Sequence, residues 1–133
     1  MSAPIVVVGA DDEKRRVWCE ALGAFGWRVY AARDIQAAID LAQRQQPRVI
    51  ISAVTLPSAS GMHFIRSLRS VVEQDVKVFG IAEAEQLAAA LSAGGFDLIV
   101  AEPVDFASLQ KSIEAAHDDH AERRPTTKLP RLS

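Results

Sequence analysis

Residues 48–61 read Arg48-Val49-Ile50-Ile51-Ser52-Ala53-Val54-Thr55-Leu56-Pro57-Ser58-Ala59-Ser60-Gly61. The apolar run 49–51 is β-branched throughout, which is typical of a short strand buried on both faces. A proline and a glycine then mark a loop, and Ser60 can cap a helix whose apolar residues recur at helical spacing as Phe64, Leu68 and Val71. The stretch therefore predicts one unit of strand, loop and helix.

The same unit occurs five times along the chain. The expected strands are residues 5–8, 27–31, 49–52, 76–81 and 96–101, and an amphipathic segment follows each of them. Strands that alternate with helices in this way form a parallel sheet covered by helices on both faces. The predicted fold class is therefore α/β, a flavodoxin-like five-stranded parallel sheet with strand order 2-1-3-4-5.

The helix signals are mostly aspartates at the start and apolar stripes within. Asp11 or Asp12, Asp34 and Asp105 are the predicted caps. In the first helix the predicted inward residues are Val17, Ala21, Leu22 and Phe25, which leaves Trp18 beside this stripe as a partly exposed candidate interface residue. In the fourth helix they are Leu87, Ala90 and Leu91.

The bulk properties exclude several classes of protein. A length of 133 residues allows one domain, and a net charge of −2 gives no global attraction to nucleic acid. No apolar run approaches the roughly 20 residues that span a bilayer, and no signal peptide is recognisable, so the cytoplasm is the expected location. Cys19 is the single cysteine and is expected in the core.

Beyond residue 118 the apolar pattern stops. We expect one domain over residues 1–118 and a flexible charged tail over residues 119–133. Four basic residues of this tail are either simply solvated or contact a partner or an acidic surface; they are Arg123, Arg124, Lys128 and Arg131.

Functional groups in such sheets gather outside the carboxyl ends of the strands. Several landmarks along the chain resemble the receiver domains of two-component response regulators, known as CheY-like domains, over roughly residues 4–117. These landmarks are Leu56-Pro57 with Gly61, the run Gly94-Gly95-Phe96-Asp97, and Glu102-Pro103. The resemblance implies a module of phosphorelay signal transduction.

The same resemblance identifies a degenerate phosphorylation pocket. Ala53 stands where the family has its phospho-acceptor aspartate, and Gly9 and Ala10 stand at the acidic pair that holds the metal. Ile81 replaces a hydroxyl residue and Glu102 replaces a lysine, while Asp11 and Thr55 lie beside the altered positions. Transfer of a phosphoryl group to a carboxylate needs a nucleophile, a divalent cation and positive charge. We therefore expect a pseudo-receiver with no catalytic residues, no cofactor and no enzymatic activity.

Two alternatives remain for this pocket. Asp11 and Glu102 could loosely hold a cation, with Ser52 or Thr55 as an unusual acceptor, although Asp11 is better explained as a helix cap and Ser52 should face away from Ala53. A small-ligand-binding domain on the same type of sheet is the second alternative.

The resemblance also implies protein partners. A sensor kinase or another signalling protein is the expected partner, and the segment Glu83–His117 is the expected face for a homodimer. No nucleic-acid-binding domain and no membrane contact are expected.

Overall fold

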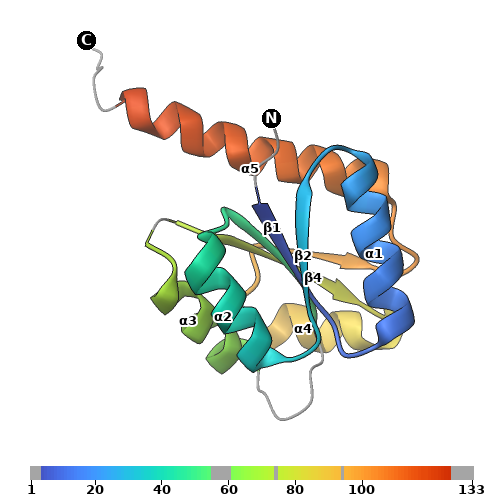
Figure 1. Cartoon of the computed structure of the whole chain (residues 1–133). Helices are drawn as coiled ribbons and strands as arrows, with labels where there is room; N and C mark the ends of the chain where they lie inside the picture. Colours follow the sequence, from blue (N-terminus) through green and yellow to red (C-terminus); the bar gives the residue numbers. More distant parts are fainter. Residues whose placement is uncertain (1–3, 55–60, 74, 94, 127–133) are drawn as a thin grey trace.

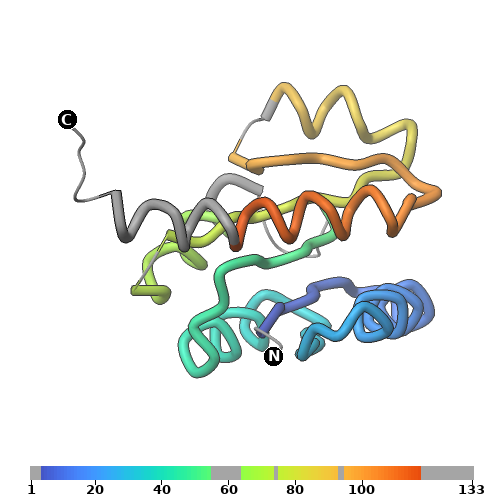
Figure 2. Tube along the Cα trace, turned by 90° about the horizontal axis from the view of Figure 1, so that it is seen from above, coloured from blue at the N-terminus to red at the C-terminus, as the bar shows by residue number. Residues whose placement is uncertain are grey.

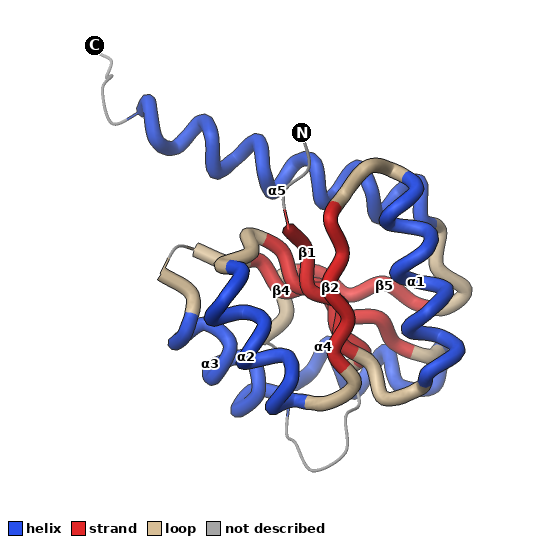
Figure 3. Tube along the Cα trace, in the orientation of Figure 1, coloured by secondary structure: helices blue, strands red, loops and turns tan. Residues whose placement is uncertain are grey.

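The computed structural model describes the backbone of residues 4–54, 61–73, 75–93 and 95–126, and side chains within these ranges except those of residues 61–63, 93 and 118–126. A parallel sheet lies at the centre, with helices around it (Figure 3). Its strands are β1 (Pro4–Val8), β2 (Arg28–Ala32), β3 (Val49–Ala53), β4 (Lys77–Ala82) and β5 (Leu98–Ala101). The order β2-β1-β3-β4-β5 confirms the predicted fold class.

The helices lie where the sequence pattern places them. They are α1 (Asp12–Ala24), α2 (Ile35–Gln45), α3 (Gly61–Val71), a short 3₁₀ turn (Ala84–Gln86) that leads into α4 (Leu87–Ala93), and α5 (Phe106–Thr126). Asp11, Asp34 and Asp105 each accept hydrogen bonds from backbone N–H groups in the first turn of the following helix, as predicted. The Ser60 cap predicted for α3 lies outside the described residues.

Two cores cover the two faces of the sheet. On one face, β-strand residues such as Val6, Ile50 and Val78 contact α2 and α3. On the other face, Val7, Ile51 and the neighbouring strand residues contact α1 and α5. Figure 1 shows these two layers of helices on either side of the strands. Successive strand residues therefore alternate between the two cores, as the period of two in a strand requires.

Two details of packing differ from the sequence predictions, and a third concerns Phe96. Trp18 is only 4% exposed, whereas Val17 and Phe25 are 43% and 45% exposed, so the inward stripe of α1 runs through Trp18 and Leu22. In α4, Leu91 is 61% exposed and only Ala90 of the predicted stripe is buried. Phe96 packs against β4 at Gly80, where a Cβ atom would lie 3.0 Å from its ring.

Helix α5 continues to Thr126, so the predicted domain boundary at residue 118 falls inside this helix. Ala121, Glu122 and Arg123 have high helix propensity. The predicted boundary was based on the spacing of apolar residues, which does not take helix propensity into account. The helix ends far from α1 and α4 in Figure 1, and Figure 2 shows α1 and α4 themselves at opposite edges of the molecule. The flexible tail predicted over residues 119–133 stays a prediction, and its residues 127–133 lie outside the described ranges.

Candidate functional site

The strand ends meet in a small pocket. Backbone hydrogen bonds set these ends level with each other: Val54 N donates to Ile81 O at 3.1 Å, and Glu102 N donates to Ala82 O at 2.8 Å. The resulting cavity is about 240 Å³ in volume. Six predicted site residues line it, namely Gly9, Ala10, Asp11, Ala53, Ile81 and Glu102. Thr55, the seventh, lies outside the described residues.

Four lining residues were not predicted from the sequence: Lys14, Trp18, Glu83 and Gln86. Lys14 and Trp18 belong to α1, whereas Glu83 and Gln86 belong to the turn that follows β4. The spacing of Lys14, Trp18 and Leu22 at intervals of four residues was the available signal, because residues four apart share one helix face. The apolar stripe through Val17 obscured that signal.

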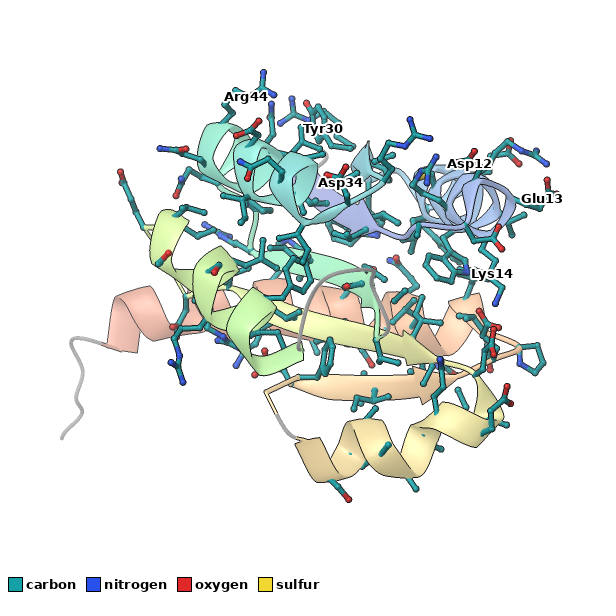
Figure 4. The ribbon with its side chains drawn as sticks, turned by 90° about the horizontal axis from the view of Figure 1, so that it is seen from below. Asp12, Glu13, Lys14, Tyr30, Asp34 and Arg44 are labelled. Atoms are coloured by element: carbon teal, nitrogen blue, oxygen red, sulfur yellow. The ribbon has the colours of Figure 1, made fainter. Side chains whose placement is uncertain are left out.

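Lys14 connects three parts of the site. Its Nζ donates hydrogen bonds to Glu83 Oε2 at 2.9 Å and to Glu102 Oε1 at 3.0 Å. Figure 4 shows this side chain directed from α1 toward the ends of β4 and β5. These two carboxylates raise the pKa of the Lys14 ammonium above its ordinary range, and the hydrogen bond from Lys14 lowers the pKa of Glu83. The Lys14 ammonium thus joins Glu83 and Glu102 beside the pocket.

Trp18 occupies the space beside the end of β1. A Cβ atom added to Gly9 would lie 3.2 Å from Cζ3 of the Trp18 ring, which is closer than ordinary van der Waals contact. The indole is buried, so it has little freedom to retreat. A carboxylate side chain at position 9 would therefore overlap the space that the Trp18 ring occupies.

Two further polar groups close to Ala53 in the described part of the chain, Asp11 and Ser52, already have hydrogen-bond partners. Asp11 is exposed, and its Oδ1 accepts the Lys14 backbone N–H at 3.0 Å, which makes it the α1 cap. Ser52 is fully buried, and its Oγ donates to the carbonyl oxygen of its neighbour Ala53 at 2.8 Å. Strand alternation places Ser52 on the face opposite to Ala53, as predicted.

Among the residues that the structure describes, no group of three or more histidine, cysteine, aspartate or glutamate side chains is arranged to hold a metal ion. Within the same ranges, every helix is too short or too polar to cross a lipid bilayer. Cys19 is half-buried against the α1–α5 core, and this burial raises the pKa of its thiol.

Comparison with known proteins identifies the class of protein that this fold and site define. Residues 5–114 match the response regulator receiver domain family. The chain therefore belongs to that family, a family of two-component signalling, and the predicted resemblance is confirmed.

Particular relatives are transcriptional regulators. The chain is 30% identical over 118 residues to the KDP operon transcriptional regulatory protein KdpE of Escherichia coli, covering 88% of this chain and 52% of that protein. It is 38% identical over 69 residues to the probable transcriptional regulatory protein TcrX of Mycobacterium tuberculosis, covering 50% of this chain and 30% of that protein. The chain thus spans about half or less of the length of these relatives.

A solved structure supports the fold independently. The response regulator receiver domain protein from Clostridium thermocellum superposes with a TM-score of 0.79 at 20% identity, over 90% of this chain and 97% of that one. At this level of identity the likeness concerns the fold alone.

Proposed function

We propose that this receiver domain is a non-enzymatic cytoplasmic module that acts in a two-component pathway by binding proteins, without being phosphorylated. The observation that carries this proposal is the composition of the pocket. A methyl group stands at position 53, and the Lys14 ammonium that lines the pocket is held between Glu83 and Glu102.

Each requirement of phosphoryl transfer meets an obstacle in this arrangement. Ala53 has no nucleophilic oxygen, and Gly9 and Ala10 offer no side-chain oxygen to a divalent cation. The Lys14 ammonium is the one positive group among the residues that line the described pocket. Because two carboxylates already neutralise it, it offers little attraction to an incoming phosphoryl group.

The expected binding face includes α4, β5 and α5, within the segment Glu83–His117. On α4, Ala88, Ala89 and Leu91 are exposed, and the edge strand β5 keeps all four of its residues partly exposed. Small exposed side chains allow a partner to approach closely, and an exposed leucine gains from burial. A sensor kinase, another signalling protein or a second copy of the chain is the partner class that this face suits.

The proposal is tested by incubation with acetyl phosphate and magnesium, followed by intact mass measurement and amide NMR. We expect no added phosphoryl group and no specific shifts at Ala10, Ala53 or Glu102, while an ordinary receiver domain treated in parallel becomes phosphorylated. Beryllium fluoride should likewise leave the spectrum unchanged. A stable phosphoryl adduct, or a fluoride-dependent shift confined to this pocket, contradicts the proposal.

The second candidate function is binding of a small ligand. The observation that favours it is that the pocket encloses a cavity. Its volume of about 240 Å³ lies just below the roughly 300–1,000 Å³ of common ligand sites. A cation between Asp11 and Glu102 would also have to displace Lys14 from Glu102. Native mass spectrometry of the purified protein distinguishes this candidate, since a retained small molecule favours it and a bare chain favours the binding module.

A further inference from the structure

A second hollow, distinct in character from the pocket, lies between α1 and the loops that follow β4 and β5. Its volume is about 600 Å³, within the range of common ligand sites. Its apolar lining comes from Val17 and Trp18 on one side and from Val104 and Phe106 on the other. We call this hollow the acid-rimmed groove, because carboxylates border the apolar lining.

The border of the groove is strongly acidic. Glu13, Glu83, Glu85 and Glu102 contribute four carboxylates, and Lys14 contributes the one ammonium among the lining residues. That ammonium is bound to Glu83 and Glu102, and Glu13 pairs with Arg16 on the exposed face of α1. The lining therefore suits a ligand that combines apolar groups with positive charge.

The chain itself contains a segment with this combination. Residues 128–132 read Lys128-Leu129-Pro130-Arg131-Leu132. The proline disfavours helix and favours an extended polyproline conformation, in which residues three apart share one side. In that conformation the two leucines lie on one side and the two cations lie on another. This pattern matches an apolar floor with an acidic border.

The groove of the same copy is out of reach of this segment. Phe106 both lines the groove and begins α5, and α5 has 21 residues, so its far end is about 30 Å from the groove. Leu132 follows Thr126 by six residues, which span at most about 20 Å when fully extended. Figure 1 shows α5 directed away from the α1 side of the domain.

We propose that the acid-rimmed groove of one copy binds the segment Lys128–Leu132 of a second copy, with the leucines on the apolar lining and the cations against the glutamates. The contact exchanges terminal segments between copies and differs from association through the exposed face of α4. It does not depend on whether the pocket at Ala53 is inactive.

Sedimentation of the full chain over a range of concentrations gives the first test. We expect association that weakens as salt rises, because charged pairs contribute to it. Substituting Leu129→Ser with Leu132→Ser, or Lys128→Glu with Arg131→Glu, should weaken association at least tenfold. Val17→Ser should weaken it as well, because this exposed side chain lines the groove. Circular dichroism verifies that each variant is folded.

Phe25→Ser is the matched control, because Phe25 is an exposed apolar residue at the end of α1 that neither lines the groove nor belongs to the segment Glu83–His117. This variant should associate like the unaltered chain. If Leu91→Ser dissociates the assembly and the tail variants do not, the α4 face is the interface and the segment-exchange proposal is wrong. A chain that is monomeric at every concentration also overturns it.

A mixing experiment tests that the contact joins two copies. One variant carries Lys128→Glu with Arg131→Glu, and the other carries Glu85→Lys, which places a cation on the groove border. Each variant alone should associate weakly, whereas their equimolar mixture should regain association because the acidic tail now matches the basic border. A mixture no stronger than its components contradicts the proposal.

Discussion

Glycine at position 9 illustrates how one residue decides what this pocket can hold. The buried Trp18 ring lies where a side chain on residue 9 would begin, 3.2 Å from an added Cβ atom. The glycine at this strand end and the large aromatic ring on α1 thus belong to one packing arrangement. A carboxylate side chain at position 9 therefore requires the ring to move.

Gly9→Asp should destabilise the fold by about 1–3 kcal/mol, because it overpacks a filled site and buries a carboxylate. Ala10→Asp is the matched control, since Ala10 is exposed, and it should change the free energy of unfolding by about 0.5 kcal/mol or less. Urea unfolding of both variants measures the difference. Equal stability of the two variants would show that the Trp18 ring yields easily.

The ion pairs of Lys14 make a second prediction at the scale of the residue, concerning pH. The hydrogen bond from Lys14 lowers the pKa of Glu83 below its ordinary value of 4.5, so this contribution to stability is present above pH 4.5 and is lost as the pH falls through the lowered pKa. The pKa of Lys14 is raised from 10.5, so its contribution is present below pH 10.5 and is lost only at still higher pH.

Lys14→Gln should therefore flatten part of the acid limb of the stability curve. Asp12 and Asp105 also have lowered pKa values, and both carboxylates are present in the unaltered chain and in Lys14→Gln. The difference between the two stability curves therefore isolates the Lys14 contacts. Unfolding midpoints in urea between pH 3 and pH 7 provide the measurement. Parallel curves for the two proteins would mean that the Lys14 contacts add nothing in solution.

At the scale of the element, α1 shows how a helix selects its inward face. Both the stripe through Val17 and the stripe through Trp18 satisfy helical spacing, and they differ by a rotation of one residue. The structure buries Trp18 and Leu22 in the core that also contains Ile5 and Val7 of β1, and the indole fills the space that Gly9 leaves open. Val17 is then left at the border of the acid-rimmed groove.

This orientation predicts unequal effects for two adjacent residues. Trp18→Ala should cost about 3–5 kcal/mol, the usual result of removing a buried aromatic side chain. Val17→Ser should cost about 0.5 kcal/mol, because the side chain is largely exposed. Thermal or chemical denaturation of the two variants measures both losses of stability. A larger loss of stability for Val17→Ser than for Trp18→Ala would show that the inward face of α1 runs through Val17.

At the scale of the whole molecule, the pocket depends on five separate segments. The ends of β1, β3, β4 and β5 and the first two turns of α1 all contribute residues. A change in one segment leaves the obstacles from the others in place. Building a phosphoryl-accepting site in this pocket should therefore require several substitutions together.

Ala53→Asp alone should not give a phosphorylated protein in acetyl phosphate and magnesium, because Glu102 and the bound Lys14 remain. The combination Ala10→Asp, Lys14→Met, Ala53→Asp and Glu102→Lys should bind magnesium measurably more tightly than Ala53→Asp, since it adds carboxylate ligands and removes the competing ammonium. Tryptophan fluorescence during a magnesium titration reports the binding. Phosphorylation of Ala53→Asp by itself would show that the surrounding residues matter little.

The sequence by itself determined the order of elements, the parallel sheet and most of the strand-end residues of the pocket. These follow from local signals, since β-branched runs, aspartate caps and glycine stops act over a few neighbours, and the strand ends of such a sheet must meet at one edge. The helix face of α1, the position of Lys14 between Glu83 and Glu102, and the exposure of Leu91 were decided only by tertiary structure. They depend on which side chains fill the space left by residues far away in the chain, such as Trp18 over Gly9, and helical spacing alone allows more than one solution.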